Sequence, residues 1–313
     1  LQTLTPEALR LSNRQNMSSN EYQPIAKHMS EQGVPIAAEL IWGLPGDNLP
    51  DFERNLDTLL ATFPNINIFG YTLLPGTEFY RRREEYQIEA IPVAGYGKAK
   101  GEYVVGCHSF TRDQGEEGYF LISAHILLVH GHIMPLTTRL LALSAQVPVS
   151  PLFRDILRSL LQRFQRKLPG LDSDDRMGVY EERNRIYLAA LAQQDLLYQT
   201  IAVALEKHHL AHGADPRPAL RILQLDRALC PRRGSEHTMR QDFAFPARAA
   251  FSALSAMELP GEAAQHSGGE TLEIHHPGGI GDILHVADGG SWLRGIITDQ
   301  ADKASEVQTV AIA

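Results

Sequence analysis

Residues 36–46 read IAAELIWGLPG and predict a strand followed by a sharp turn. Apart from Glu39, residues 36–42 are apolar, which is typical of a strand buried in a protein core. The strand should end at Gly43–Gly46, because glycine and proline favour turns. Asp47 and Asn48 follow as candidate caps of a helix. The apolar residues of this helix recur at helical spacing, and they are Phe52, Leu56, Leu59, Leu60 and Phe63.

Strand and helix patterns alternate on both sides of this stretch. Before it, residues 1–3 resemble the end of a strand, and two helices follow, opened by Thr5-Pro6 and by the capping box of Ser18 and Glu21. After it, the sequence predicts a strand over 66–74, a turn at Pro75-Gly76, a helix over 78–86 and a strand over 103–110. This βαβαβα pattern predicts parallel strands with right-handed crossovers, so ligands should bind at the carboxyl ends of the strands.

The rest of the chain predicts two further domains after an α/β domain at 1–110. The second domain, 111–233, is mostly helical, and the third, 234–313, is an acidic region that contains β-strands. From Glu258 to the C-terminus, nine acidic residues accompany only Arg294 and Lys303. The predicted helices cover 115–146, 151–168, 180–209 and 218–229, and the strand-like runs cover 271–274, 283–286 and 307–312.

The composition excludes several classes of protein. The 313 residues are 43% hydrophobic and 21% charged, which is typical of a soluble globular protein. A net charge of −8 argues against nucleic acid as the main partner. Residues 119–149 carry one permanent charge, Arg139, but histidines and a proline interrupt them, which favours buried helices over a membrane span. The two cysteines, Cys107 and Cys230, match no disulfide framework, which fits a cytoplasmic protein.

Four short motifs give the α/β domain a family resemblance: Leu1-Gln2-Thr3, Asn13-Arg14, residues 39–46 and Leu74-Pro75-Gly76-Thr77. In this order and spacing they resemble the second half of the radical S-adenosylmethionine (SAM) barrel. The nearest branch includes cobalamin-binding proteins and oxygen-independent coproporphyrinogen dehydrogenases. The resemblance covers residues 1–110 and implies strands four to six of a parallel (β/α) barrel, followed by a mostly helical domain and a small β-containing tail. It implies reductive cleavage of SAM to generate a substrate radical, and it leaves the use of cobalamin open.

The resemblance also implies which residues contact SAM. SAM carries a carboxylate, an ammonium group, a ribose diol and an adenine, so its site needs a cation, hydrogen-bond acceptors and exposed backbone. In the relatives these come from a strand-end Gln, an Arg twelve residues later and an acidic residue before the next glycine turn, which match Gln2, Arg14 and Glu39. Gly43 and Thr72 complete the expected cofactor-binding set.

Each of these residues also has a structural explanation. An ionised Glu39 inside an apolar strand is costly unless it is paired, so it could form a salt bridge instead of a ligand contact. Arg14 could end an exposed helix. Gly43, like Gly46 and Gly76, could serve only a turn that needs positive φ, although such turns also let backbone approach a ligand.

The chain departs from the family in its cysteines. Radical SAM proteins hold a [4Fe-4S] cluster with a CxxxCxxC motif after the first strand, and this sequence contains neither that motif nor strands one to three. Cys107 and Cys230 cannot replace the three ligands. We therefore expect the C-terminal portion of such an enzyme, inactive alone, whose partners are an N-terminal half with the cluster and a small-molecule substrate. Absence of that half should uncover Ile36, Leu40 and the Phe69 region.

Other candidate sites have simpler explanations. His208 and His212 are spaced to share a helix face and a metal, but no carboxylate accompanies them, so a solvated helix end is favoured. Residues 275–282, HHPGGIGD, have neither Walker nor Rossmann spacing, which favours a turn. Core or substrate-pocket positions are expected for His125, His130 and His132, and a buried position for the Cys107 thiol.

Two other functions stay open. A non-catalytic binding or scaffold protein could keep the fold without the cluster, and an in-frame CxxxCxxC before Leu1 would exclude it. A TIM-barrel aldolase or phosphate enzyme would need a strand-end lysine or a phosphate-binding glycine loop. Neither stands at the predicted strand ends.

Overall fold

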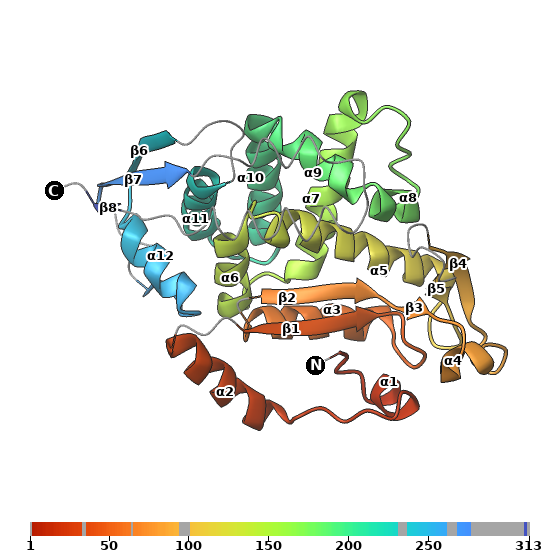
Figure 1. Cartoon of the computed structure of the whole chain (residues 1–313). Helices are drawn as coiled ribbons and strands as arrows, with labels where there is room; N and C mark the ends of the chain where they lie inside the picture. The colour runs from red at the N-terminus through yellow and green to blue at the C-terminus, as the bar shows by residue number, and fades with distance from the viewer. Residues whose placement is uncertain are drawn as a thin grey trace. The chain divides into compact units, whose positions relative to one another are not determined.

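The protein is a mixed α/β protein, as the sequence predicts (Figure 1). Its residues form two compact units, Leu1–Ser123 and Ala124–Ala313, which are described one at a time. The three domains expected from the sequence, 1–110, 111–233 and 234–313, therefore remain a prediction. The computed structural model describes residues 2–32, 36–63, 65–93, 101–230, 237–261, 268–276 and 310–311.

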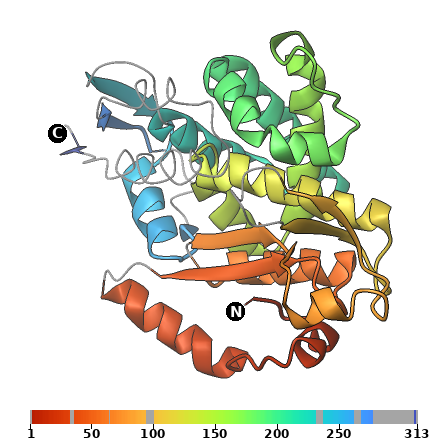
Figure 2. The same ribbon diagram turned by 45° about the vertical axis from the view of Figure 1, so that its right-hand side comes forward.

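The centre of the first unit is a β-α-β crossover. Strand β1 (Ala37–Trp42) pairs in parallel with β2 (Asn65–Gly70), and helix α3 (Leu49–Leu60) connects them. Figures 1 and 2 show the two strands side by side from two directions. The predicted strand, helix and parallel pairing around residues 36–46 are therefore confirmed.

One face of the β1–β2 pair forms the core of this unit. Side chains alternate between the two faces of a strand, so Leu40 and Trp42 are buried together with Ile66 and Ile68. The Trp42 ring packs on Phe52 of α3, with ring centroids 4.8 Å apart. The expected apolar stripe of α3 is buried as predicted, at Phe52, Leu56, Leu59 and Leu60.

The opposite face of the pair carries Ala37, Glu39, Asn65 and Phe69, all exposed. Phe69 is 38% exposed, in agreement with the expectation for this region. The expectation for Leu40 is wrong, because the alternation places its side chain in the core.

Two helices precede β1. The predicted capping box is present, since the Ser18 backbone N–H and hydroxyl both donate to the Glu21 carboxylate, at 2.8 and 2.7 Å. Beside β1, the backbone N–H of Ile41 donates to the carbonyl oxygen of Gln2 at 2.7 Å, so the first described residue lies along this strand. The two helices are α1 (Pro6–Leu11) and α2 (Ser19–Glu31).

The predicted strand over 66–74 is interrupted at Tyr71, which corrects the βαβαβα pattern. The Tyr71 N–H donates to the Trp42 carbonyl at 2.7 Å, but its own carbonyl accepts from Val104 N–H at 3.2 Å. The chain therefore changes partners at this residue. The strands beyond it form an antiparallel sheet of order β3-β5-β4, made by β3 (Thr72–Leu73), β4 (Glu89–Pro92) and β5 (Glu102–Gly106), with the short helix α4 (Glu78–Arg81) between β3 and β4.

The second unit is mostly helical, as predicted for this part of the chain. The helix expected over 115–146 is divided, because a π-turn and the Gly131–Pro135 segment break it. Helix α10 packs on α7, and α11 packs on α6. The elements are α5 (Arg112–His125, which starts in the first unit), η1 (Ile126–His130), α6 (Pro135–Ser144), α7 (Val149–Phe164), η2 (Gln165–Lys167), α8 (Arg176–Glu181), α9 (Arg183–Leu191), α10 (Gln194–Ala211) and α11 (Arg217–Leu229).

A small antiparallel sheet of order β6-β7-β8 belongs to the same unit. The strand predicted over 271–274 lies within β7, and part of the one over 307–312 is β8, whereas 283–286 lie outside the described residues. The elements are β6 (His237–Phe243), α12 (Ala247–Ser255), β7 (Glu270–His276) and β8 (Val310–Ala311).

Among the described residues, no single helix is long and apolar enough to cross a membrane, and one sharply bent pair, Arg112–His130 with Pro135–Ser144, passes that test by length and composition.

Candidate functional site

The candidate site lies at the carboxyl end of β1, where the chain turns at Gly43–Gly46. Gly43 and Gly46 both have positive φ, 96° and 93°, as the turn motif predicted. A Cβ atom on Gly46 would lie 2.8 Å from the backbone nitrogen of Ala8. Glycine is therefore required for α1 to approach this turn.

Gly43 lies close to the segment that joins β2 to β3. A Cβ atom on Gly43 would meet the Val104 carbonyl oxygen at 3.3 Å and the Tyr71 Cβ at 3.8 Å. Thr72, the neighbour of Tyr71, is half-buried and pairs with Tyr103 of β5. The structure thus brings two predicted positions, Gly43 and Thr72, to the same end of the parallel strands.

Arg14 lies near the same strand end, where its charge acts on Tyr71. The Arg14 side chain is exposed, and its positive charge acts on the Tyr71 hydroxyl. Burial raises the pKa of Tyr71, while a hydrogen bond with Thr77 and the charge of Arg14 oppose that rise. Arg14 is therefore an exposed cation close to a half-buried phenol at the end of β2.

Gln2 is held beside β1 by its backbone, through the bond to Ile41 described above. Its side-chain oxygen Oε1 is buried and has no hydrogen-bond partner among the described residues. Buried polar atoms are nearly always hydrogen-bonded, so this oxygen is a candidate acceptor for a ligand or water.

Glu39 lies on the exposed face of β1, in register with Asn67 of β2. The premise that Glu39 is buried inside an apolar strand is therefore wrong, because the alternation of side chains points it away from the core. No ion pair or hydrogen bond joins Glu39, Arg14 and the Gln2 side chain to one another within the described part of the chain.

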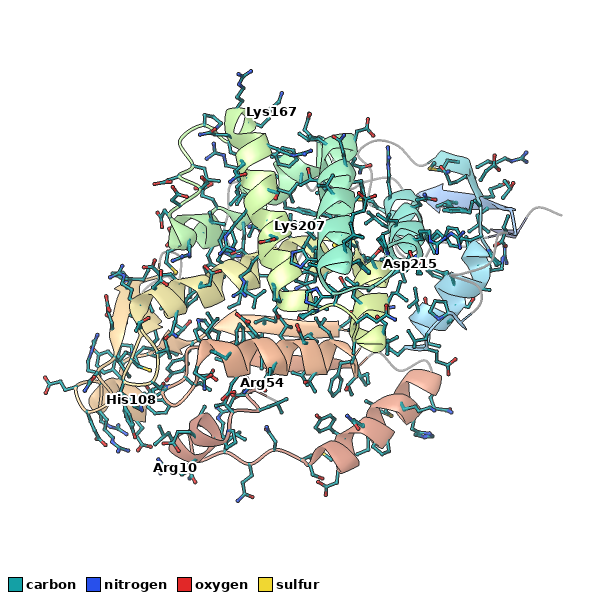
Figure 3. The ribbon with its side chains drawn as sticks, turned by 180° about the vertical axis from the view of Figure 1, so that it is seen from behind. Arg10, Arg54, His108, Lys167, Lys207 and Asp215 are labelled. Carbon is teal, nitrogen blue, oxygen red and sulfur yellow. The ribbon has the colours of Figure 1, made fainter. Side chains whose placement is uncertain are left out.

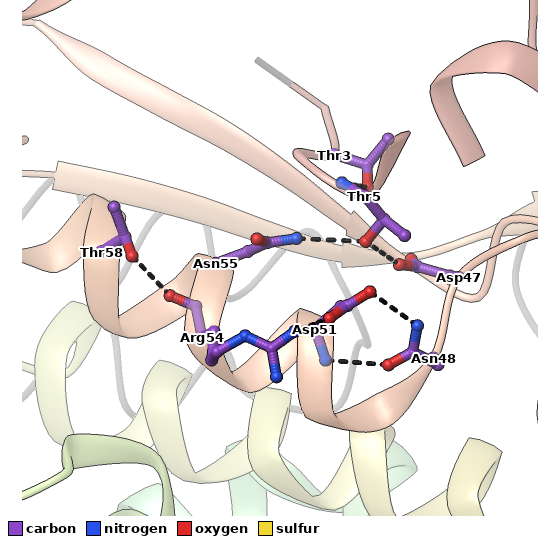
Figure 4. A network of polar contacts seen from close by, with 8 residues as sticks. All are labelled: Thr3, Thr5, Asp47, Asn48, Asp51, Arg54, Asn55 and Thr58. Atoms are coloured by element: carbon purple, nitrogen blue, oxygen red, sulfur yellow. Dashed lines mark hydrogen bonds and ion pairs between the residues drawn. The ribbon is translucent and has the colours of Figure 1, made fainter. Parts of the chain in front are cut away.

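Asp47, at the end of the turn, is the most unusual polar residue of the first unit. It is 1% exposed, and its Oδ1 accepts a hydrogen bond from the Thr5 hydroxyl at 2.8 Å (Figure 4). Asn55 of α3 donates to the same hydroxyl oxygen at 3.2 Å. Burial raises the pKa of Asp47 to about 7, although the hydrogen bond from Thr5 lowers it.

The sequence predicted Asp47 only as one of two candidate helix caps. Asn48 is the cap, since its side chain accepts from the Asp51 N–H at 2.9 Å (Figure 4). The signal that could have identified Asp47 is a carboxylate placed directly after a glycine turn and before a capped helix. Thr5, its partner, carried no signal beyond its own predicted cap role.

Cys107 borders the turn from the end of β5. The Gly46 N–H donates to the Ser109 hydroxyl at 3.0 Å, and the Cys107 sulfur lies 3.2 Å from that hydroxyl. Cys107 is half-buried, less than the buried position expected, and Cys230 is buried in the other unit. The two thiols thus lie in different units.

The histidine candidates lie in the second unit. His125 and His130 are buried and their rings pack edge to face, with centroids 4.9 Å apart, while His132 is half-buried. No group of three or more metal-ligating side chains occurs among the described residues. The loop of residues 275–282 lies beyond the described residues from Pro277 onward.

The histidines near the end of α10 have mixed environments. His208 and Lys207 both contact Asp155, at 2.9 and 3.0 Å, and Lys207 projects from the helix surface (Figure 3). His209 is buried, and its Nδ1 bonds to the Leu205 carbonyl at 2.7 Å. The solvated helix end that the sequence favoured therefore holds for His212 but not for His208, which bonds to Asp155, or for His209.

A second buried carboxylate was missed in this unit. Asp226 of α11 accepts from the backbone N–H groups of Leu136 and Thr137 and from the Thr137 hydroxyl, at 3.0, 2.8 and 2.7 Å. It satisfies N–H groups at the start of α6. Burial raises its pKa to about 7, against the effect of these hydrogen bonds and of Arg139.

No family model matches this sequence, and no curated protein matches it closely enough to count as a relative.

Proposed function

We propose that this chain contributes the SAM-binding strand ends of a radical SAM enzyme, as the C-terminal portion of its barrel. The observation that carries the proposal is the convergence at one strand end of a parallel β-α-β unit. There the positive-φ turn of Gly43, the Thr72 segment and the cation of Arg14 come together. Parallel sheets bind ligands at this end of their strands.

The residues present fit the chemistry of SAM. The buried, unpartnered Oε1 of Gln2 can accept a hydrogen bond, and Arg14 is an exposed cation for a carboxylate. Glu39 is an exposed acceptor for an ammonium group or a diol. Gly43 itself is buried against Val104 and Tyr71, so it shapes the turn and leaves no open backbone for the adenine. In the family, SAM supplies a 5′-deoxyadenosyl radical that abstracts hydrogen from the substrate.

The residues do not fit a [4Fe-4S] cluster. Such a cluster needs three closely spaced thiolates, and this sequence has only two cysteines, of which Cys230 is buried. The proposal therefore assigns no step through the cluster to this chain, and places the cluster ligands outside residues 1–313.

The absence of a CxxxCxxC motif from the sequence also favours a second candidate, a non-catalytic binding or scaffold protein with a degenerate radical SAM fold. Such a protein could retain the β-α-β unit without using Arg14 and Glu39 for SAM. The two candidates differ in whether SAM binds through these side chains.

Isothermal titration calorimetry of SAM into the chain tests the proposal. Arg14→Gln and Glu39→Gln should each weaken binding by about one to two decades, because each removes a charge-assisted contact worth about 1.5–3 kcal/mol. Both side chains are exposed, so neither change should unfold the protein. Circular dichroism checks that point.

Matched controls are Arg166→Gln and Glu206→Gln, which alter exposed residues of the same types in the second unit. They should leave SAM affinity unchanged. Absence of SAM binding, or equal affinity in all five proteins, would reject the proposal in favour of the scaffold.

A further inference from the structure

The segment Gln2–Thr5 is held against the turn after β1 by one buried side chain, Asp47. We propose that Asp47 is a positioning residue that binds this segment through Thr5 and releases it as the pH rises toward neutrality, so that proton uptake regulates the site. The inference rests on the proposed function only in naming SAM as the ligand of that site. The hydrogen-bonded pair is called here the Asp47–Thr5 clamp.

The geometry makes the clamp the main polar link between segment and turn. The Thr5 hydroxyl donates to Asp47 Oδ1 at 2.8 Å, and the Thr5 N–H donates to the Thr3 hydroxyl at 3.1 Å (Figure 4). Asp47, Thr5 and Thr3 are all buried. Gln2, at the start of this segment, is bound to β1 through Ile41. Opening of the clamp would leave the start of this segment held to β1 through the backbone bond of Gln2.

Asp47 lacks the partners that an ionised carboxylate needs. Its Oδ2 is buried and has no hydrogen-bond partner among the described residues. The N–H groups of Gly43 and Asn48 lie near enough to lower the pKa, but neither meets the geometry of a hydrogen bond to Oδ2. A buried charge with a single strong hydrogen bond is costly, so the closed clamp favours the protonated acid.

Within the described part of the chain, no charged side chain lowers the pKa of Asp47 to offset this cost. The charged or titratable groups on the surrounding elements are Glu7 and Arg10 on α1, Glu39 on β1, Asp51, Glu53, Arg54 and Asp57 on α3, and Cys107 and His108 after β5. Glu7 pairs with Arg10, Asp51 pairs with Arg54, and His108 bonds to the Tyr86 carbonyl. None of them contributes to the pKa of Asp47, which burial dominates.

The direction of the pH effect follows from linkage. The closed clamp holds a proton up to about pH 7, whereas a solvated aspartate loses its proton near pH 3.8. Between these values, opening of the segment releases one proton, so opening becomes about tenfold more favourable for each unit of pH. Above pH 7 both states are ionised and the dependence disappears.

Hydrogen–deuterium exchange of the peptide that covers residues 2–11, corrected for intrinsic rates, measures the clamp without any ligand. In the wild type, protection should fall by about tenfold per pH unit between pH 5 and pH 7, wherever local opening dominates exchange, and should then level off. Asp47→Asn keeps an acceptor for Thr5 but cannot titrate, so its protection should be independent of pH. Thr5→Val should lose protection at every pH.

Glu206→Gln is the control, and it should retain the wild-type pH dependence. A flat profile in the wild type would overturn the inference, as would an Asp47→Asn variant with the wild-type slope. If Asp47→Asn does not fold, the wild-type profile and Thr5→Val still decide the question.

Titration of SAM at the same pH values separates this inference from the proposed function. Affinity should fall between pH 5 and pH 7 in the wild type and stay constant in Asp47→Asn. If SAM does not bind at any pH while the exchange profile retains its slope, the proposed function fails and the clamp stands. If SAM binds but the exchange profile is flat, the clamp fails and the proposed function stands.

Discussion

The indole of Trp42 lies directly against Gly118, so closely that a Cβ atom at position 118 would stand 2.2 Å from the indole nitrogen. The same nitrogen donates a hydrogen bond to the carbonyl of Gly115 at 2.9 Å. The strand that leads into the candidate site is therefore fixed to α5 by two glycines, which leave room for the largest buried side chain of the first unit.

Gly118→Ala should destabilise the protein by about 1–3 kcal/mol, because the added methyl group overpacks the indole. Helix propensity alone would predict the opposite sign, a stabilisation of up to about 1 kcal/mol for alanine over glycine. Urea unfolding followed by tryptophan fluorescence measures the difference. A stabilised variant would show that the Trp42–Gly118 contact is not as close as described.

Asn48→Ala should cost about 1 kcal/mol, since it removes the acceptor for the Asp51 N–H at the start of α3. Asn48→Asp keeps a side-chain oxygen there and should retain most of the stability. The neighbouring Asp51 carboxylate, which accepts from the Asn48 amide at 2.7 Å, would repel the new charge and so reduce the rescue. Equal stability of the alanine and wild-type proteins would contradict the role of Asn48 as the cap.

The β-α-β unit could be predicted from the sequence because every local signal agreed. The apolar run of β1, the glycine turn and the spacing of Phe52 and Leu56 all point to one strand, one turn and one helix. The interruption at Tyr71 could not be predicted, because residues 66–74 are as suited to one strand as to two. Long-range pairing with Val104 determines where the chain changes sheets.

The candidate site was predicted only in part, for a related reason. Gly43 was recognisable because a positive φ leaves a mark on residue type. Burial leaves a weaker mark on the sequence, so Glu39 was taken as buried and Asp47 only as a candidate cap, whereas Glu39 is exposed and Asp47 is buried. Which face of a strand meets the core, and which turn residue points inward, depends on partners far along the chain.

Reconstitution with iron and sulfide should give no stoichiometric [4Fe-4S] absorbance in this chain. Cys107 and Cys230 offer two thiols where three closely spaced ones are needed. Iron and acid-labile sulfide analysis after removal of excess reagent measures the content. Cys107→Ala with Cys230→Ala is the control, and it should retain the same background. Four irons per chain in the wild type would reject the assignment.

The free energy of unfolding of Asp47→Asn, taken relative to wild type, should increase as the pH rises from 4 to 7. Burial raises the pKa of Asp47 from an ordinary value of 3.8 to about 7. Because the pKa of Asp47 is raised in the folded state, the carboxyl contributes its full stabilisation below pH 3.8. This contribution is lost as the pH approaches 7, because the unfolded state then binds fewer protons than the folded state. The loss is at most roughly 4 kcal/mol, at 1.36 kcal/mol per unit of pKa. The asparagine avoids this loss.

Asp226→Asn is the informative comparison, because Asp226 also has a pKa of about 7 but a different set of partners. Asp226 uses both carboxylate oxygens to accept from Leu136 and Thr137, and asparagine keeps only one acceptor. Asp226→Asn should therefore destabilise the protein at every pH, whereas Asp47→Asn, which needs one acceptor for Thr5, should not. Urea unfolding at four pH values between 4 and 7.5, evaluated as the difference from wild type, separates the two. A pH-independent difference for Asp47→Asn would show that the buried carboxylate at the turn does not titrate in this range.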